Sequence, residues 1–522
     1  MIDGSMQSYR LTLDKFLSHA AKWHPDAQVV SGGEGGSVHR ISYAALHDRA
    51  QGVSGALAAL GIGRGDRVAT LAWNTQGHVE AWYGIMGMGA ICHTLNPRLT
   101  AAQIGAMLAQ SEARVLLASP DLLPLAREAS ANLPALRRIL LLDADAGEAD
   151  ADAFAPLVEA APRGCEWGDF DETLPSGLCF TSGSTGAPKG VTYTHRGCYL
   201  HTMRQLQADV LGPTPRDAIL AVVPMFHANA WGLPFAAPAV GAKLVLPGRH
   251  TDGASLARLI RSEGVTAAAG VPTVWLGLVE HLEAEGGDVP TLTRILVGGS
   301  SMPPALMERI ETRLGAEVQT SWGMTELSPL GTAALPGDPQ RQASLSGRPA
   351  LGIDLLLTDA EGRALPEQRG AEGHLRVRGG TVVERYFGQS EPATDADGWF
   401  DTGDLARIDE SGNLTITGRA KDLIKSGGEW INPAEIEALV GALPQVSLAA
   451  VIGRPDPKWG ERPILLVETH GEAVSDEDLL APLAGRVASW WMPDAVVRVD
   501  AMPLAATGKI DKMQLRAEYG QV

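Results

Sequence analysis

A run of glycine and hydroxyl residues carries the clearest sign of chemistry in this sequence. Residues 181–190 read TSGSTGAPKG and directly follow the apolar residues 177–180. Glycine lets a backbone approach an anion closely, hydroxyl and N–H groups donate hydrogen bonds, and Lys189 adds a positive charge. Such a loop can bind phosphate, although GxxxxGK[ST], the Walker A pattern, is absent. The pattern alone also fits an ordinary Gly/Ser surface loop.

Seven further short motifs follow this loop in order along the chain. They are PMFH at 224–227, GGSS at 298–301, SWGMTE at 321–326, WFDTGD at 399–404, GRAKD at 418–422, SGGE at 426–429 and TGK at 507–509. With these motifs the sequence resembles the acyl-adenylate-forming superfamily over nearly its whole length. Segments 67–73, 89–93, 94–98 and 490–494 further resemble the bacterial medium- and long-chain fatty acyl-coenzyme A synthetases of that superfamily.

The resemblance implies an AMP-forming acyl-coenzyme A ligase. In such an enzyme a carboxylic acid and ATP give an acyl adenylate and pyrophosphate, and coenzyme A then takes the acyl group and releases AMP. ATP, Mg²⁺ and coenzyme A are therefore expected, with a small carboxylic acid as the remaining partner. The roles below are those that the matching family motifs imply.

The implied nucleotide site draws on most of the motifs. Trp322 takes the position of an aromatic ring beside adenine, and Asp404 that of a carboxylate that accepts hydrogen bonds from the ribose hydroxyls. Arg419 matches a ribose or phosphate contact, with a structural salt bridge as the alternative interpretation. The expected contacts of ATP and AMP are Thr181, Ser182, Gly183, Ser184, Thr185, Gly186, Lys189, Gly298, Gly299, Ser300, Ser321, Trp322, Gly323, Met324, Thr325, Asp404, Arg419 and Lys509.

Four residues are expected to act on the phosphates. Glu326 matches the Mg²⁺ ligand, with Thr185 as a further metal contact, because a hard cation prefers oxygen ligands. Thr325 would donate a hydrogen bond to the α-phosphate. Lys509 matches the lysine that reaches the substrate carboxylate and the α-phosphate, where an ammonium group offsets the repulsion between two anions.

The second half-reaction is expected to use the C-terminal part of the chain. Lys421 falls at the hinge of the family, about which a small domain rotates between adenylation and thiolation. Glycines there would let the thin pantetheine arm of coenzyme A pass close to the backbone. The expected channel residues are Ser426, Gly427, Gly428, Glu429 and Trp430.

Specificity is expected on the acyl side of the site. Residues 227–231, HANAW, resemble the family segment in which an aromatic side chain guards the acyl tunnel, so Trp231 is the expected gate. His227 would lie beside the reacting carboxyl group and Gly299 in the acyl pocket. Buried packing is the alternative interpretation of His227 and Trp231.

The resemblance favours a medium- or long-chain fatty acid as substrate. A short thioether acid such as 3-methylmercaptopropionate, or an aryl or branched acid, stays open because one methylene group changes binding by only about 1 kcal/mol. Other classes also remain. A luciferase-like oxidoreductase would share the adenylation motifs, and a peptide-synthetase adenylation domain would normally precede a carrier domain. A non-catalytic nucleotide-binding protein would have no need of Lys509.

The elements that must position these residues form a layered α/β pattern. Ser42 can cap a helix that ends at Gly61, because apolar residues recur there at spacings of three and four. Helical stretches separate many short apolar runs, which predicts largely parallel sheets. Strands are expected at 67–72, 114–118, 219–223, 243–246, 265–269 and 294–297.

The pattern changes after about residue 340. Alternation at 374–378 and frequent turn residues predict a β-rich subdomain up to Gly418. Beyond Lys421 an α+β pattern follows, with a helix opening at Asn432 and a capped helix from Ser475. Strands are expected near 446–452 and 464–468. We therefore expect an N-terminal AMP- and acyl-binding domain over 1–419 and a mobile C-terminal domain with the catalytic lysine over 420–522.

Composition limits the partners. The chain has 43 Lys and Arg against 61 Asp and Glu, and its formal net charge of -18 disfavours nucleic acids and anionic membranes. Its four cysteines lack CxxC spacing, which fits a reducing compartment better than disulfides or a zinc site. No long apolar stretch or signal-peptide pattern is found, so a cytoplasmic protein is expected. The resemblance also implies a homodimer.

Overall fold

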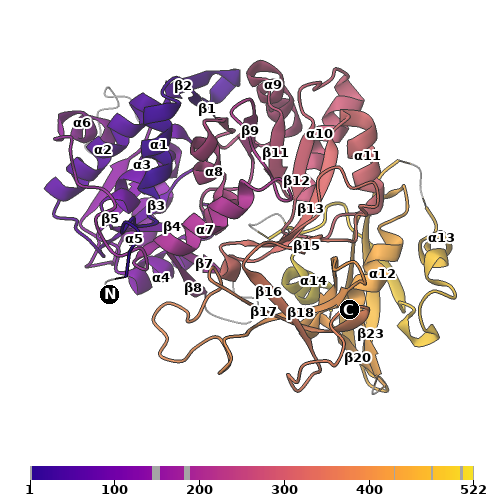
Figure 1. Cartoon of the computed structure of the whole chain (residues 1–522). Helices are drawn as coiled ribbons and strands as arrows, with labels where there is room; N and C mark the ends of the chain where they lie inside the picture. The colour runs from indigo at the N-terminus through magenta and orange to yellow at the C-terminus, as the bar shows by residue number, and fades with distance from the viewer. Residues whose placement is uncertain are drawn as a thin grey trace.

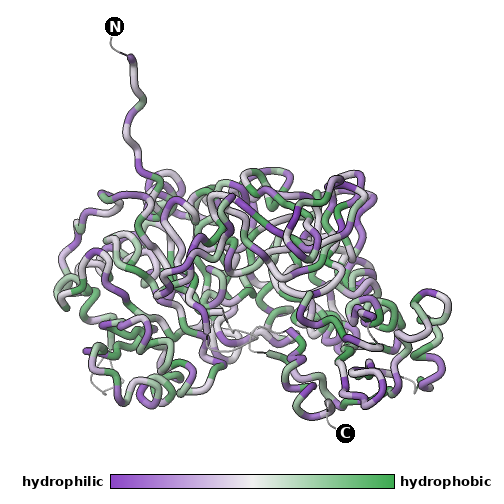
Figure 2. The backbone as a smooth tube through the Cα atoms, turned by 90° about the horizontal axis from the view of Figure 1, so that it is seen from below, coloured by the Kyte–Doolittle hydropathy of each residue, from purple (hydrophilic) through white to green (hydrophobic). Residues whose placement is uncertain are grey.

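The computed structural model describes residues 3–143, 153–181, 188–427, 429–471, 474–505 and 509–520. Two sheets with their helices occupy most of the molecule, and two smaller sheets follow toward the C-terminus (Figure 1). The exposed N-terminal segment extends away from this body (Figure 2). In the described part of the chain, no helix combines the length and apolar character that a membrane crossing requires.

The first sheet is parallel except for its last strand, which is antiparallel to its neighbour. Its strands run in the order β6 (Arg138–Leu141), β5 (Val115–Ala118), β3 (Arg67–Leu71), β4 (Ile91–Thr94), β7 (Pro175–Thr181) and β8 (Lys189–Thr194). The helices of this region are α1 (Asp14–Trp23), α2 (Tyr43–Ala59), α3 (Gln76–Gly87), α4 (Ala101–Ser111), α5 (Leu123–Ser130), α6 (Phe154–Ala160) and the 3-10 helix η2 (Pro120–Leu122).

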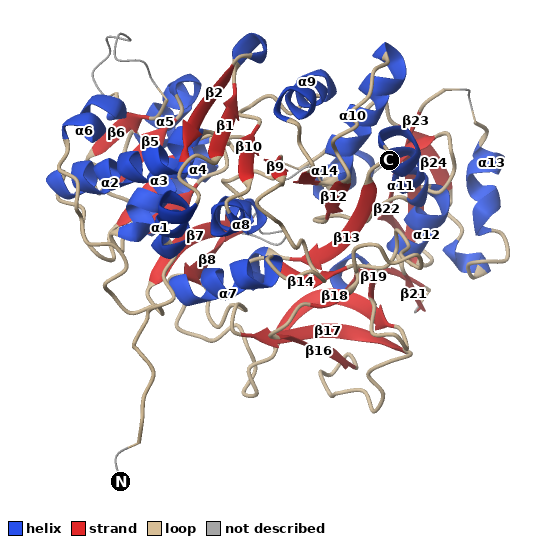
Figure 3. Cartoon of the chain, turned by 45° about the horizontal axis from the view of Figure 1, so that its top comes forward, coloured by secondary structure: helices blue, strands red, loops and turns tan. Residues whose placement is uncertain are grey.

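The second sheet is parallel through its centre and antiparallel at both ends. Its order is β15 (Arg348–Pro349), β14 (Leu330–Ala333), β13 (Glu317–Gly323), β12 (Arg294–Val297), β11 (Ala267–Gly270), β9 (Ala218–Ala221), β10 (Lys243–Leu246), β1 (Gln28–Gly32) and β2 (Val38–Ser42). Its region contains α7 (His195–Gln205), α8 (Leu233–Val240), α9 (Gly253–Glu263), α10 (Pro272–Glu285), α11 (Pro304–Leu314), and the 3-10 helices η1 (Glu34–Gly36), η3 (Ala228–Gly232) and η4 (Thr325–Leu327). The prediction of a layered α/β fold with largely parallel sheets is confirmed (Figure 3).

The β-rich region predicted after residue 340 is an antiparallel sheet. Its strands are β16 (Ile353–Thr358), β17 (Ala371–Gly379), β18 (Phe400–Ile408) and β19 (Leu414–Arg419). The alternation that predicted it has a physical basis, because Leu375 and Val377 are fully buried while Arg376 between them and Arg378 after them are less so. The 3-10 helix η5 (Ala420–Asp422) follows this sheet directly.

The last sheet is covered on both faces, and this fixes the position of the C-terminal helix. Alternate residues of its two long strands belong to two separate apolar clusters, one of which contains α12 and α13 residues and the other Leu515 of α14. The strands are β21 (Glu429–Ile431), β20 (Ile424–Ser426), β23 (Gly460–Thr469), β22 (Val446–Asp456) and β24 (Ala495–Arg498). The helices are α12 (Pro433–Val440), α13 (Asp476–Leu480), α14 (Lys512–Tyr519), η6 (Ala481–Leu483) and η7 (Ser489–Trp491).

The element boundaries follow the sequence signals closely where a cap or an apolar run defines them. The Ser42 hydroxyl accepts the N–H of Ala45 at 3.2 Å and begins α2, and Asn432 and Ser475 cap α12 and α13 in the same way. β10 and β12 begin and end where predicted, and β3, β5, β9 and β11 differ by one or two residues. β22 and β23 are each about four residues longer at one end than predicted, because their pairing continues to the pair Asp456 and Gly460.

Candidate active site

The carboxyl ends of two parallel strands bring expected nucleotide residues to one edge of the second sheet. Residues 298–300 directly follow β12, and residues 321–323 end the adjacent β13. The Ser321 hydroxyl donates to the carbonyl of Val297 at 2.9 Å and ties these two strand ends together. Ligands of α/β proteins commonly bind at this edge of a sheet.

The backbone between β13 and η4 is held from several sides. A side chain at Gly323 would place its Cβ 2.2 Å from the carbonyl oxygen of Pro329, so only glycine fits there. The N–H of Met324 donates to the same Pro329 carbonyl at 3.0 Å. The Tyr193 hydroxyl donates to the carbonyl of the buried Thr325 at 3.1 Å. This segment therefore presents Thr325 from a rigid turn.

Asp404 is the centre of a hydrogen-bonded group. Its buried carboxylate forms an ion pair with Arg419, with Nε 2.9 Å from Oδ1, and accepts the indole N–H of Trp322 on Oδ2 at 3.0 Å. Asp404 and Arg419 also face each other in the β18–β19 pair. Burial raises the pKa of Asp404, and the charge of Arg419 opposes this. The salt bridge that was the alternative interpretation of Arg419 is thus present, and it orients the carboxylate.

Glu326 is a second buried carboxylate at this edge, with 8% of its surface exposed. The Tyr386 hydroxyl donates to its Oε1 at 3.0 Å, and the ammonium group of Lys189 lies 4.9 Å from the centroid of the Tyr386 ring. Burial raises the pKa of Glu326, whereas the Tyr386 hydrogen bond and the charges of Arg419 and Lys189 lower it. Tyr386 therefore contacts both Lys189, through its ring, and Glu326, through its hydroxyl.

Tyr386 was not among the site residues predicted from the sequence. This residue lies outside the motifs, in the largely polar loop between β17 and β18. The N–H of the neighbouring Phe387 donates to the carbonyl of Gly190 at 2.8 Å, which fastens the loop to the end of the glycine-rich segment. An aromatic hydroxyl in an otherwise polar loop was the only available signal.

Lys509 reaches this edge from the segment between β24 and α14. Its Cε lies 3.8 Å from the position that a Cβ on Gly299 would occupy, and Gly299 has a left-handed backbone with φ of 83°. Burial lowers the pKa of Lys509 to about 8, and the charge of Arg419 contributes, while Asp404 and Glu326 act in the opposite direction. The structure thus brings together the lysine, the glycine turn and both buried carboxylates.

Trp231 and His227, the residues expected on the acyl side, also lie at this cluster. The Trp231 indole lies over the glycine turn, with Cη2 3.3 Å from the Cβ position of Gly298 and Cζ2 3.8 Å from that of Gly299. Burial lowers the pKa of His227 to about 4, and the charge of Lys509 adds to this effect. His227 is therefore neutral at physiological pH, and the indole and the ammonium group meet at Gly299.

The backbone that carries Trp231 is strained. Ala228, Asn229, Ala230 and Trp231 have φ of 44°, 53°, 46° and 51°, and Gly232 follows with φ of 77°. A left-handed residue other than glycine or asparagine costs roughly 1–2 kcal/mol, so Ala228, Ala230 and Trp231 together cost roughly 3–6 kcal/mol. Such strain persists only where surrounding contacts hold it, and it is common at functional sites.

The expected hinge and channel residues lie on different elements from this cluster. Lys421 lies in η5, and burial lowers its pKa. The Ser426 hydroxyl at the end of β20 accepts a hydrogen bond from Arg462 Nη1 at 3.1 Å. Gly427 donates its N–H to the carbonyl of Trp459 at 2.7 Å. Glu429 and Trp430 in β21 are exposed, Trp430 by 54%.

Residues 17–387 match the AMP-binding enzyme family, and residues 435–509 match the AMP-binding enzyme C-terminal domain. The chain belongs to the AMP-binding enzyme family. These two matches include the sheet edge described above and extend to Lys509.

Full-length relatives support the same family. The chain is similar to a medium-chain-fatty-acid–CoA ligase of Ectopseudomonas oleovorans, with 42% identity over 534 residues covering 99% of this chain and 98% of the relative. It is also similar to a 3-methylmercaptopropionyl-CoA ligase of Ruegeria pomeroyi, with 40% identity covering 99% of each. Its fold is similar to that of an anthranilate CoA ligase solved with anthranoyl-AMP, with a TM-score of 0.89, 24% identity and 98% of each chain covered. The prediction of an AMP-forming acyl-coenzyme A ligase, an acid–thiol ligase, is confirmed.

Several residues expected to bind ligands in this AMP-binding enzyme lie outside the described part of the chain. They are Ser182, Gly183, Ser184, Thr185 and Gly186 of the glycine-rich loop and Gly428 of the expected channel. Of the nucleotide contacts expected in this loop, the structure describes Thr181 and Lys189. Thr181 ends β7, and Lys189 begins β8.

The donor set suits a Mg²⁺ ion held mainly by substrate. Among the described residues no three His, Cys, Asp or Glu side chains cluster as metal ligands. Mg²⁺ commonly binds one or two carboxylates together with phosphate oxygens and water, so it needs no such cluster. Glu326, buried beside the strand ends and oriented by Tyr386, offers one suitable carboxylate.

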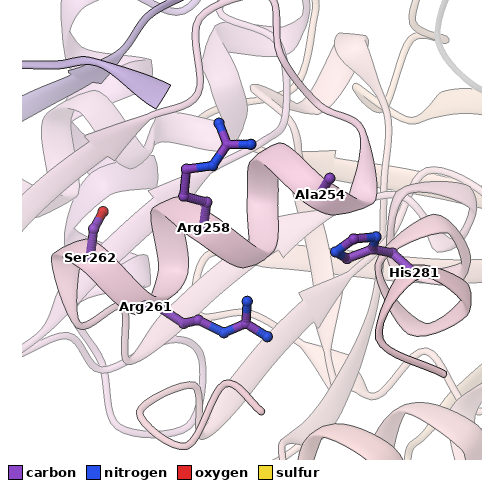
Figure 4. Close-up of a pocket in the computed structure, with 5 residues that line it drawn as sticks. All are labelled: Ala254, Arg258, Arg261, Ser262 and His281. Carbon is purple, nitrogen blue, oxygen red and sulfur yellow. The ribbon is translucent and has the colours of Figure 1, made fainter. Parts of the chain in front are cut away.

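A separate hollow lies on the surface of α9 and α10, away from the strand ends. Figure 4 shows Arg258 and Arg261 leaving α9 in different directions and His281 approaching from α10. Arg261 donates through Nε to the carbonyl of Asp288 at 2.7 Å. Because the side chains of Arg258 and Arg261 do not point to a common position, we do not assign a ligand site to this hollow.

Proposed function

We propose that this ligase activates a medium- or long-chain fatty acid at the Gly298–Gly299 turn. The observation that carries the proposal is the meeting of Lys509 and Trp231 over Gly299, with His227 close enough to the lysine for its charge to lower the histidine pKa. A reacting carboxyl group at this point would lie between a cation and an apolar indole. The similarity to a medium-chain-fatty-acid–CoA ligase supports this substrate class.

A short thioether acid, or an aryl or branched acid, is the second candidate. The 3-methylmercaptopropionyl-CoA ligase is nearly as similar to this chain as the fatty acid ligase, at 40% against 42% identity. Apolar pockets discriminate weakly between acids that differ by one methylene group, which changes binding by as little as about 1 kcal/mol.

Adenylation follows from the charges at the sheet edge. The ribose hydroxyls of ATP would donate to Asp404, and Lys189 and the glycine-rich loop would hold the phosphates. Lys509 would lie between the substrate carboxylate and the α-phosphate and stabilise the charge that spreads over the phosphoryl oxygens. Thr325 would donate to the same phosphate. Glu326 would hold a Mg²⁺ ion, which would neutralise the charge that develops as pyrophosphate leaves.

Thiolation requires a different position of the C-terminal part of the chain. In this proposal Lys421 is the hinge between domains 1–419 and 420–522. Rotation would withdraw Lys509 and bring residues 426–430 to the acyl adenylate, so that the coenzyme A thiol can attack the acyl carbon. Gly427 has a left-handed backbone with φ of 60°, and a Cβ there would come within 2.8 Å of the Trp459 indole, so a glycine is required at this turn of the channel segment.

We infer a cytoplasmic location and a homodimeric state for this ligase. Cys92, Cys165, Cys179 and Cys198 are free thiols, which fits a reducing, cytoplasmic compartment. We infer a homodimer from the family resemblance. Sedimentation of the purified protein would test the dimer independently of its activity.

The test of the proposed substrate is a panel of acids. The purified protein is incubated with ATP, Mg²⁺, coenzyme A and straight-chain, thioether or aryl acids, and AMP and thioester are followed by mass spectrometry. Straight-chain acids of medium or long chain should give the highest kcat/KM, with one AMP for each thioester. A clear preference for the thioether or aryl acids would replace the fatty acid proposal, and adenylate without thioester would point to another acceptor.

A further inference from the structure

Helix α7 holds the strained turn that carries Trp231. α7 packs against η3, which contains Trp231, and against α8, which directly follows η3. Figure 3 shows α7 beside α8. Three buried polar residues of α7 face this turn, at positions four and three residues apart along the helix. They are Cys198, His201 and Gln205.

Each of these three residues contacts a different part of the turn. The Asn229 side-chain amide donates to Cys198 Sγ at 3.5 Å, near the start of the turn. The side-chain amide of Gln205 donates to the carbonyl of Trp231 itself. The His201 ring lies against Gly232, where a Cβ would come within 2.8 Å of Nδ1. The hydrogen bond to Trp231 is therefore made by Gln205.

Two buried polar atoms beside this contact are left without a partner. Within the described residues, Oε1 of Gln205 and Nε2 of His201 form no hydrogen bond, although both side chains are 1% exposed. Buried polar atoms are normally paired, and an unpaired one destabilises the arrangement that leaves it so. The strained backbone of the turn and two buried atoms without hydrogen-bond partners therefore lie next to each other.

A strained element with unpaired neighbours is suited to having two positions. In the observed position the indole covers Gly298 and Gly299, where the proposed acyl chain would enter. Release of the left-handed backbone would relieve its strain. Oε1 of Gln205 and Nε2 of His201 could then accept hydrogen bonds from N–H groups of the rearranged turn. The hydrogen bond from Gln205 to Trp231 opposes this release.

We propose that Gln205 is a positioning residue that sets the acyl-chain selectivity of the ligase by holding Trp231 over the glycine turn. This inference rests on the proposed acyl site. An acid that fits beneath the indole reacts with the hydrogen bond intact. A longer acid that needs the space of the indole is adenylated only after the bond between Gln205 and the Trp231 carbonyl breaks.

The test compares two substitutions that keep the size of the side chain. Gln205→Met removes the donor, and Gln205→Glu replaces the donor by an acceptor that faces a carbonyl. Met203→Ala, on the exposed side of the same helix, is the matched control. Acid-dependent ATP–pyrophosphate exchange is measured for straight-chain acids from butanoate to hexadecanoate.

Both Gln205 variants should raise the ratio of kcat/KM for long against short acids, by about fivefold for the loss of one hydrogen bond. The KM for ATP and the ratio in the Met203→Ala variant should not change. An equal loss for every acid would show a structural role and overturn the proposal, as would an unchanged ratio.

A double-mutant cycle separates positioning from damage to the fold. In a Trp231→Ala background, Gln205→Met should no longer change the ratio, because no indole remains to be held. A change of the same size in both backgrounds would contradict the inference. If the unaltered protein forms no adenylate with any acid, the proposed function itself fails. If the unaltered protein forms adenylates but the Gln205 variants leave the ratio for long against short acids unchanged, only the role of Gln205 is refuted.

Discussion

The indole N–H of Trp322 donates to Oδ2 of Asp404 at 3.0 Å, while Arg419 occupies Oδ1 of the same carboxylate at 2.9 Å. The ring proposed to flank adenine and the carboxylate proposed to hold the ribose are therefore joined. Each carboxylate oxygen keeps a further lone pair for a ribose hydroxyl. A change in the ring should act on ribose binding through the carboxylate.

Trp322→Phe should raise the KM for ATP about fivefold, because one hydrogen bond that orients Asp404 is lost. The KM for the acid should change less. A matched control is Trp275→Phe, since Trp275 is a fully buried indole whose N–H has no partner within the described residues. Steady-state kinetics with ATP and acid varied separately checks the prediction. Equal effects of the two substitutions would remove the proposed link between ring and ribose.

Tyr386→Phe should move the acid limb of the pH profile of adenylation to higher pH. The Tyr386 hydroxyl lowers the pKa of Glu326, so its loss leaves that pKa higher and the carboxylate protonated over a wider range. The apparent affinity for Mg²⁺ at low pH should weaken for the same reason. Pyrophosphate exchange measured against pH and Mg²⁺ concentration tests this. Tyr9→Phe, at an exposed tyrosine, should behave as the unaltered protein does.

The alkaline limb of adenylation should belong to Lys509. Because its pKa in the free enzyme is lowered to about 8, kcat/KM should fall about tenfold for each pH unit above that value as the ammonium group loses its proton. His227, with a pKa of about 4, is already neutral there and makes no contribution. Lys509→Arg keeps the charge at high pH. The residual kcat/KM of Lys509→Arg should therefore not fall above pH 8. If it still falls, the alkaline limb belongs to a group other than Lys509.

Trp231→Ala should change the preference among acids more than the affinity for ATP. The indole covers the glycine turn, and its removal opens the space above Gly298 and Gly299. Longer or bulkier acids should gain relative to short ones. Competition between two acids of different length, analysed by mass spectrometry of the thioesters, measures the preference. Parallel changes in acid preference and ATP affinity would contradict the role of Trp231 as a gate.

The sequence predicts those parts of the site that are contiguous in the chain. The motif at 321–326 identifies residues of β13 and η4 together, and the lysine in TGK lies at the same strand edge in the structure. Tyr386 and Gln205 could not be found in this way, because each acts on a residue far away in the sequence. The left-handed turn also has no sequence signal, since alanine and tryptophan rarely adopt positive φ.

The strands of the fold also differ in how accurately their ends are predicted from the sequence. Short apolar runs such as 243–246 predict buried strands accurately, because burial decides both their composition and their ends. β22 and β23 extend into residues such as Arg454 and Arg462, where pairing between the strands, rather than apolar character, sets the end. The boundary between residues 419 and 420 stays a prediction.

The most direct test of the account separates the two half-reactions in Lys509→Ala. Acid-dependent pyrophosphate exchange should fall at least about a hundredfold, as expected for loss of a group that stabilises the transition state. ATP binding by calorimetry should be retained, and thioester formation from supplied acyl adenylate and coenzyme A should continue. Lys458→Ala, at an exposed lysine of the same C-terminal sheet region, is the control for adenylation. Undiminished exchange in Lys509→Ala would contradict the proposed mechanism.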